Sequence, residues 1–302
     1  MLAAALLLDA VLGEPKWLWS RLPHPVVLIG RLIDRLDRAC NRGRWRRAKG
    51  LLALGIVLLV SSVLPVAVVF FEYGWVIEIV GAAILLAHRS LVDHVRDVAA
   101  GLRRGLAQGQ DAVSLIVGRD PRRLDEAGVS RAAIESAAEN FSDGVVAPAF
   151  WFALGGLPGI VVYKAVNTAD SMIGHRTERY RDFGWAAARL DDLLNWVPAR
   201  LTGLLLCGVG RGRVALGVML RDAGQHRSPN AGWSEAAMAA SLGVALVGPR
   251  DYGSYQVDDP YMNAEGTPEA GPADIDRAVG LLWRAWTALS LGALLAVILG
   301  QS

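Results

Sequence analysis

The sequence has few cysteines and lacks the short motifs that mark several common classes of soluble enzyme. Its two cysteines, Cys40 and Cys207, form no C-x-x-C pair, which argues against a disulfide framework and against a zinc site. Walker A, G-x-G-x-x-G, nucleophile-elbow and H-E-x-x-H sequences are all absent from the chain. The net charge of +2 on 302 residues is close to neutral, and no internal repeat is visible. P-loop, Rossmann, serine-hydrolase and zinc-peptidase chemistries are therefore excluded.

What the chain has in abundance is apolar residues, and these are gathered into blocks. Hydrophobic residues make up 53% of it, and residues 51–71 and 278–299 each approach the roughly 20 residues that cross a bilayer. The shorter blocks 75–87, 144–162, 196–209 and 236–247 fit short, tilted or re-entrant helices, and residues 1–13 fit an anchoring helix rather than a removable signal peptide. We predict an all-α, polytopic membrane protein with short or re-entrant helices, forming a single integral membrane domain over 1–302.

The distribution of positive charge predicts which side of the membrane the loops occupy. Eight basic residues lie between Arg31 and Lys49, and by the positive-inside rule this loop is cytoplasmic. Because residues 88–131 are also rich in arginine, 51–87 should form an out-and-back hairpin that turns near residues 72–74. We expect a multi-pass protein of the inner cell membrane. No nucleic-acid motif accompanies the basic loop, so we assign it to lipid headgroups and predict no nucleic-acid partner.

Residues 89–143 are predicted to form a cytoplasmic helical insertion that carries a row of carboxylates. Glu135, Glu139 and Asp143 fall at i, i+4 and i+8, so they share one face if a helix extends that far. An acidic stripe paired with arginines is the alternative. The row continues into an apolar block that Gly155-Gly156-Leu157-Pro158-Gly159 would break. A re-entrant hairpin there would leave this polar site facing the cytoplasm.

Two further polar runs follow the broken block. Lys164, Asn167 or Thr168, Ser171 and His175 recur at helical spacing, with Asp170 beside that face. The second run offers three oxygen-bearing side chains one turn apart, which suit Mg²⁺, at Asp191, Asp192 and Asn195. The alternative interpretation is a capping role for Asp191, or a salt bridge to Arg189 or Arg200.

Towards the C-terminus the sequence contains a candidate anion-binding loop and a polar linker. His226, Ser228 and Asn230 precede a predicted helix that carries Glu235, and the free amides of a helix N-terminus attract phosphate. Residues 251–277 are acidic and rich in turn formers, as expected of a solvated linker or a lid. The residues alone therefore predict a cytoplasm-facing polar site that binds Mg²⁺ and an anionic ligand.

Two other function classes fit the same pattern. A transporter of an anionic solute would also show a broken helix and polar groups within the membrane. The second class is a membrane transferase that acts on a lipid diphosphate, because Asp191-Asp192-x-x-Asn195 is loosely similar to acidic Mg²⁺-diphosphate motifs.

Several long motifs in the same order resemble those of the CobD/CbiB family of adenosylcobinamide-phosphate synthases. They include Leu8-Asp9-Ala-Val-Leu-Gly13-Glu14-Pro15, Leu22-Pro23-His24-Pro25-Val26, Glu139-Asn140-Phe-Ser-Asp143-Gly144, Tyr163-Lys164-Ala-Val-Asn167-Thr168-Ala-Asp170-Ser171, Arg189-Leu-Asp191-Asp192-Leu-Leu-Asn195 and His226-Arg-Ser-Pro-Asn230. The resemblance covers nearly the whole chain. It implies an ATP-dependent ligase of cobalamin biosynthesis that joins adenosylcobyric acid, a corrinoid, to (R)-1-amino-2-propanol O-2-phosphate, giving adenosylcobinamide phosphate through a hypothesised acyl phosphate.

On this basis we assign hypothetical roles to individual residues, with ATP and Mg²⁺ as the expected cofactors. A homo-oligomer is one possible assembly. The catalytic candidates are Glu139, Asp143, Lys164 and Asp170, and the metal candidates are Asp143, Asp191 and Asp192. The candidates for binding substrate or phosphate are Asn140, Asn167, Thr168, Ser171, His175, Asn195, Arg200, His226, Ser228 and Asn230. A transporter of a corrinoid or other anionic solute remains the alternative function.

Overall fold

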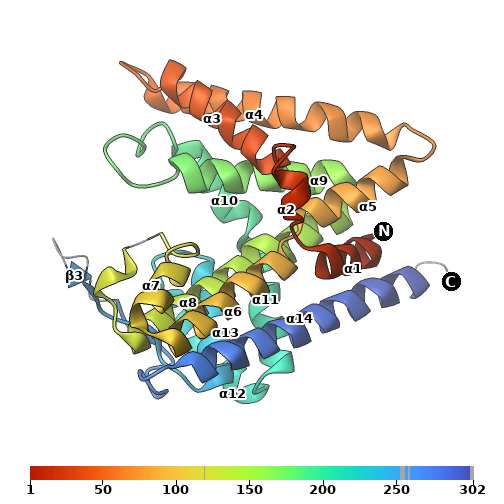
Figure 1. Ribbon diagram of the computed structural model, residues 1–302. Coiled ribbons are helices and arrows are strands. Elements are labelled where there is room, and N and C mark those ends of the chain that lie inside the picture. The colour runs from red at the N-terminus through yellow and green to blue at the C-terminus, as the bar shows by residue number, and fades with distance from the viewer. Residues whose placement is uncertain (119, 252–255, 258, 300–302) are drawn as a thin grey trace. The chain divides into compact units, whose positions relative to one another are not determined.

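A computed structural model describes residues 1–118, 120–251, 256–257 and 259–299 of the chain. Helices dominate the described residues, and the strands found there are two residues long, so the all-α prediction is confirmed (Figure 1). The α-helices are α1 (Leu2–Leu12), α2 (Lys16–Trp19), α3 (Pro25–Cys40), α4 (Arg46–Val69), α5 (Gly74–Leu85), α6 (His88–Arg104), α7 (Leu106–Val113), α8 (Glu126–Phe141), α9 (Ala147–Ile173), α10 (Trp185–Leu194), α11 (Trp196–Val209), α12 (Arg213–Asp222), α13 (Ala231–Leu242) and α14 (Pro272–Leu299).

Internal contacts divide the chain into two compact units. The first unit comprises Met1–Ala87 and Ala147–Trp196, and the second comprises His88–Val146 and Val197–Ser302. The predicted insertion over 89–143 therefore packs with the C-terminal part of the chain. The domain boundaries proposed from the sequence, including a single domain over 1–302, stay predictions. Residues 252–255 and 258 of the predicted linker 251–277 lie outside the described residues.

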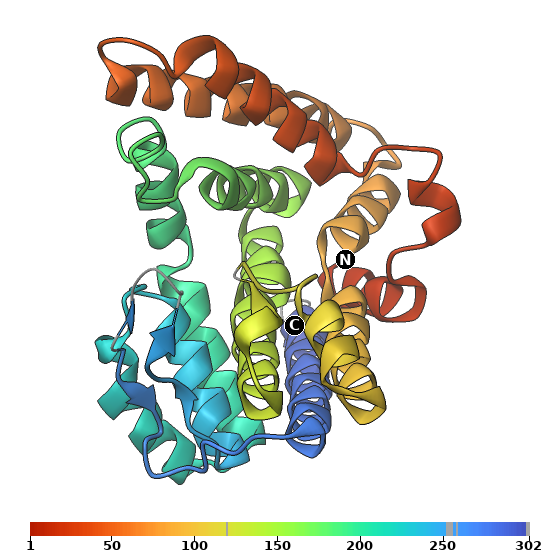
Figure 2. The same ribbon diagram turned by 60° about the vertical axis from the view of Figure 1, so that its left-hand side comes forward.

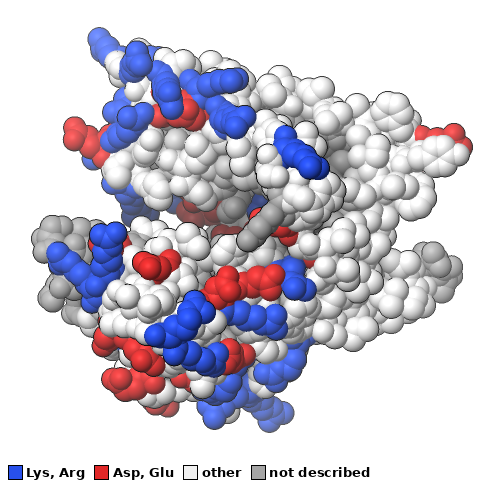
Figure 3. Space-filling view, viewed as in Figure 1, with Lys and Arg blue, Asp and Glu red and all other residues white. Residues whose placement is uncertain are grey.

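Among the residues that the structure describes, four helical segments are long and apolar enough to cross a membrane, as a multi-pass protein requires. They are Arg46–Val69, Gly74–Arg104, Glu126–Ile173 and Pro272–Leu299. The predicted hairpin is present, because α4 and α5 contact each other and a short turn joins them at residues 70–73. In Figure 3, Lys and Arg side chains gather where α3 ends and α4 begins, whereas the surface over the far half of α4 is largely uncharged.

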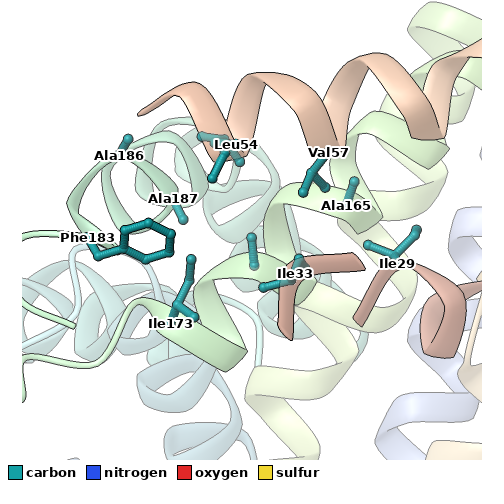
Figure 4. Packing of buried hydrophobic residues seen from close by; sticks show 11 residues of the cluster. Ile29, Ile33, Leu54, Val57, Ala165, Ile173, Phe183, Ala186 and Ala187 are labelled. Atoms are coloured by element: carbon teal, nitrogen blue, oxygen red, sulfur yellow. The ribbon is translucent and has the colours of Figure 1, made fainter. Parts of the chain in front are cut away.

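The first unit is held together by an apolar cluster between α3, α4, α9 and α10. Ile29 and Ile33 of α3 meet Leu54 and Val57 of α4, and Phe183 covers the end that adjoins α10 (Figure 4). Because α4 and α9 belong to segments long enough to cross a bilayer, close packing of these side chains rather than their transfer from water holds the helices together. This packing fixes α10 against α9, which carry the predicted site residues of this unit.

The predicted break in the apolar block is present inside α9. Gly155 (φ −133°, ψ 16°) and Gly156 (φ 57°, ψ −151°) have non-helical backbone angles, and Pro158 follows within the next turn. A break frees backbone amides that water cannot reach in a membrane. One of them, the N–H of Leu157, donates to Oε2 of the buried Glu78 on α5 over 3.2 Å. The carboxylate of Glu78 thus caps the second half of α9.

The second unit contains a helix bundle and a small strand region. Helices α6, α8 and α14 contact one another, and α8 also contacts α13 (Figure 2). Strand β1 (Leu246–Val247) pairs antiparallel with β4 (Tyr261–Met262), and β2 (Arg250–Asp251) pairs with β3 (Gln256–Val257). Two 3₁₀ turns, η1 (Pro121–Arg123) and η3 (Ala223–Gln225), join neighbouring helices.

The predicted carboxylate row is only partly realised. Helix α8 ends at Phe141 and continues as a π-helical segment, η2 (Ser142–Val146), which widens the turn that carries Asp143. Glu135 is buried, and its Oε1 accepts a hydrogen bond from the N–H of Val247 over 2.9 Å, whereas Glu139 is exposed. The α-helix therefore does not extend to Asp143, so the condition for one shared face is not met and the three side chains occupy different environments.

Candidate functional site

In the first unit, Asp191 lies at the centre of a polar network between α9 and α10. Its Oδ1 accepts from Nδ2 of Asn167 over 3.3 Å and its Oδ2 accepts from Nδ2 of Asn195 over 3.0 Å. The amide oxygen of Asn195 in turn accepts from the hydroxyl of Tyr163 over 2.9 Å. Three side chains, Tyr163 and Asn167 of α9 and Asn195 at the end of α10, thus orient one buried carboxylate. The alternative salt bridge to Arg189 is not formed, since two amides hold Asp191.

The charge on Asp191 is costly in this environment. Burial raises its pKa to about 7, with a further increase from the charge of Asp170, and the two amide hydrogen bonds only partly offset this. Burial also raises the pKa of Asp192, although the nearby guanidinium groups of Arg189 and Arg176 oppose the rise. The negative charges of neighbouring carboxylates repel one another. A cation bound between such carboxylates would be stabilised by them.

The donor chemistry of this region fits Mg²⁺. Carboxylate oxygens from Asp191 and Asp192 are hard ligands, and Mg²⁺ commonly takes one or two protein carboxylates together with water and substrate phosphates. Within the parts of the chain that the structure describes, no group of three or more His, Cys, Asp or Glu side chains is arranged to hold a metal. The amide of Asn195 is used at both ends, by Tyr163 and by Asp191, so it orients the carboxylate.

Four other predicted site residues of the first unit lie on α9. Lys164 and Asp170 are half-buried on α9, and Asp170 packs against Gly174 at the end of that helix. The hydroxyls of Thr168 and Ser171 donate to the carbonyls of Lys164 and Asn167 within α9 itself.

His175 does not continue the predicted helical row. Helix α9 ends at Ile173, and His175 lies exposed in the following loop, so the prediction of one continuous helical face is wrong there. The chain leaves the helix at Gly174, and the backbone of Gly184 approaches the carbonyl of Ile173 so closely that a Cβ would clash with it.

In the second unit, the predicted anion-binding loop is an ordered turn ahead of α13. Oγ of Ser228 accepts from the N–H groups of Asn230 and Ala231, both at 3.2 Å, and so caps the helix. Nδ1 of His226 accepts from the N–H of Ser228 over 3.0 Å, which places the ring proton on Nε2 when the imidazole is neutral. That nitrogen lies 3.6 Å from Oε2 of the buried Glu235.

Arg200 is positioned beside this loop by an aromatic ring and an amide. Its guanidinium carbon lies 4.6 Å from the ring centre of Trp233, and its NH1 group lies 3.5 Å from Oδ1 of Asn230. Stacking of this kind holds a guanidinium without removing its charge. Arg200, Asn230 and the start of α13 therefore form a group that can attract an anion.

Two of the remaining predicted residues, Asn140 and Asp143, lie where α8 passes into η2. Nδ2 of Asn140 donates to the carbonyl and to the hydroxyl of Ser136, at 2.9 and 3.0 Å. The same hydroxyl donates to the carbonyl of Ile116 over 2.6 Å. Asp143 is half-buried in η2, where the wider turn separates it from the α-helical register of Glu139.

Sequence reasoning missed three residues that the geometry makes important. Tyr163 orients Asn195, and its spacing of four residues before Asn167 was the available signal. Trp233 stacks on Arg200 from one turn into α13, which only the packed structure reveals. Glu78 was visible as an acidic residue within an apolar block, which is itself a signal of function or of a buried partner.

Comparison with known proteins gives a consistent result. The model of the family described as CobD/Cbib protein matches residues 2–282. Cobalamin biosynthesis protein CobD of Rhizobium meliloti (strain 1021) is 52% identical over 307 residues, covering 96% of this chain and 94% of the relative. The protein of the same name from Brucella suis biovar 1 (strain 1330) is 54% identical over 304 residues, covering 94% and 92%. No solved structure matches the chain. The long motifs of the sequence and this match over nearly the whole chain agree, and the protein belongs to the CobD/CbiB family.

Proposed function

We propose that this protein is an adenosylcobinamide-phosphate synthase that joins a carboxylate of adenosylcobyric acid to the amine of (R)-1-amino-2-propanol O-2-phosphate. The observation that carries the proposal is the family match over residues 2–282, together with close relatives named for cobalamin biosynthesis. A biosynthetic enzyme of this family needs groups that bind phosphate and a divalent cation. We assign these two tasks to the two polar groups described above.

The chemistry follows from the poor reactivity of a carboxylate towards an amine. ATP, as a substrate, would transfer its γ-phosphoryl group to the carboxylate, giving an acyl phosphate and ADP. The neutral amine would then attack the acyl carbon, and phosphate would leave as the amide forms. Charge on the phosphoryl oxygens must be stabilised in the first step, and a proton must leave the amine in the second.

In the first unit we assign phosphoryl binding to the α9–α10 network. Asp191 and Asp192 would hold Mg²⁺, which when bound neutralises charge on the phosphate oxygens. Asn167 and Asn195 fix the direction of the Asp191 carboxylate, and Tyr163 fixes Asn195. We assign Lys164 to the phosphate oxygens and Asp170 to orienting the reacting groups.

In the second unit we assign substrate-phosphate binding to the loop ahead of α13. Arg200 and Asn230 would contact the phosphate of the aminopropanol substrate, because a guanidinium fork matches phosphate geometry. His226 and Ser228 shape this loop through their bonds to its backbone. Within this unit Asp143 stays a candidate metal ligand, and we assign Glu139 to the removal of the amine proton.

We also propose that the protein lies in the inner membrane with its site facing the cytoplasm, where ATP is available. The support is the positive charge gathered between α3 and α4 and the four segments long enough to cross a bilayer.

The decisive experiment is a reaction with purified, detergent-solubilised protein, adenosylcobyric acid, aminopropanol phosphate, Mg²⁺ and ATP. Corrinoid mass and ADP release are followed together. We expect the corrinoid to gain one aminopropanol phosphate unit for each ADP formed, with this reaction lost in Asp143→Ala, Lys164→Ala and Asp191→Asn. Asp34→Asn is the matched control, because Asp34 forms an exposed pair with Arg38.

Well-folded protein that forms no amide would refute the ligase proposal. Corrinoid uptake into vesicles without ATP consumption would then favour the transporter instead.

A further inference from the structure

The first unit contains an apolar cavity that the proposed reaction does not use. It has a volume of about 530 Å³ and lies between α3, α4, α5 and the second half of α9. Apolar side chains such as Ile29, Val68, Leu85 and Leu157 form most of its wall. Its size falls within the range of ordinary ligand sites, which is roughly 300–1,000 Å³.

Some of the apolar side chains that line this cavity are also exposed at the surface, and we call them its rim. Leu28, Val60, Leu64 and Ile77 line it and are 50%, 54%, 72% and 51% exposed. Val60 and Leu64 belong to α4 and Ile77 to α5, both within segments long enough to cross the bilayer. The medium at this rim is therefore hydrocarbon rather than water.

One charged residue, Arg35 on α3, stands among the lining residues. It is exposed and, among the residues that the structure describes, no carboxylate pairs with it. Its neighbour Arg38 differs, since it pairs with Asp34 and does not line the cavity. Ser61 adds the only hydroxyl of the lining. A cationic group at one side of an apolar cavity complements an amphipathic anion.

We propose that this cavity is a binding site for an anionic phospholipid of the bilayer, with one acyl chain inside it and the phosphate on Arg35. A lipid chain is already in an apolar medium, so the hydrophobic effect contributes little to this binding. The gain comes from the dispersion contacts of a chain that fills a void, and from the ion pair at Arg35. The proposal concerns a lipid site and does not depend on the proposed reaction.

The test is native mass spectrometry of the full chain after exchange into nanodiscs of equal phosphatidylglycerol and phosphatidylcholine. We expect one retained phosphatidylglycerol per chain. Ser61→Phe, which fills the cavity, should lower retention of both lipids at least fivefold. Arg35→Gln should abolish the preference for phosphatidylglycerol while a lipid is still retained. Arg38→Gln, the matched control on the same helix, should behave as the wild type.

Equal lipid retention in wild type and Ser61→Phe would overturn the proposal, as would an unchanged headgroup preference in Arg35→Gln. If Ser61→Phe is not monodisperse, Ile84→Phe fills the same cavity from α5 and replaces it. A second readout uses phosphatidylglycerol carrying a diazirine on its acyl chain. Cross-links to the cavity lining support the proposal, and cross-links confined to exposed residues outside it, such as Leu59 and Val63, refute it.

Discussion

Replacing Gly156 by alanine tests how the broken helix α9 is held within the membrane. Gly156 has φ 57° and ψ −151°, a conformation that is almost confined to glycine. A Cβ at this position would lie 2.8 Å from Oε2 of Glu78, the oxygen that accepts the N–H of Leu157. The substitution therefore strains the backbone and displaces the cap at the same time.

The magnitude follows from these two effects. The backbone conformation costs about 1–3 kcal/mol for a residue with a side chain. Losing the acceptor of a buried N–H costs about 1–3 kcal/mol more. We expect Gly156→Ala to destabilise the protein by about 2–6 kcal/mol. Gly155→Ala is the matched control, because φ there is −133° and a Cβ meets nothing within 4 Å.

The assay is unfolding of the purified protein in mild detergent, by denaturant titration with helical circular dichroism. Glu78→Ala should cost about 1–3 kcal/mol, and Glu78→Gln should cost less because an amide oxygen remains as acceptor. The double variant Gly156→Ala/Glu78→Ala should be less destabilised than the sum of the single variants, because both act on one contact. Equal stability of Gly155→Ala and Gly156→Ala, or strict additivity in the double variant, would refute the reasoning.

Three further predictions concern the two polar groups and the fold around them. Tyr163→Phe removes the hydroxyl that orients Asn195, so the Mg²⁺ concentration for half-maximal ligation should rise about tenfold; an unchanged Mg²⁺ dependence would contradict this role. Ser228→Ala removes the cap of α13 and should cost about 0.5–2 kcal/mol in denaturant unfolding, with Ser228→Thr close to wild type. Burial raises the pKa of Asp222, but hydrogen bonds from Arg221 and from the Asn263 N–H outweigh it and leave the pKa below its ordinary value. Stability from this carboxylate is thus present above about pH 4 and lost as pH falls through its lowered pKa, so the thermal midpoint of Asp222→Asn should vary less with pH there than that of wild type.

The sequence by itself determined those features that depend on residues close to one another along the chain. Continuous apolar blocks predicted the helices α4 and α14, and the positions of Gly155, Gly156 and Pro158 predicted the break in α9. Both follow from local physics, since a block of apolar residues must leave water and a Gly-Gly-x-Pro run cannot stay helical. The capped turn ahead of α13 belongs to the same class, because Ser228 bonds residues two and three positions away.

Only the tertiary structure decided which polar side chains meet. The i, i+4, i+8 spacing of Glu135, Glu139 and Asp143 gave no sign that Glu135 binds Val247 or that a π-helical turn intervenes. The spacing of Asp191 and Asn195 placed them together, but Asn167 and Tyr163 join them from another helix. A pattern in sequence specifies which face of a helix is apolar, whereas the partner of that face depends on how whole helices pack. The packing of whole helices therefore decided three features. These are the bond from Asn167 to Asp191, the bond from Leu157 to Glu78 at the break in α9, and the apolar cavity.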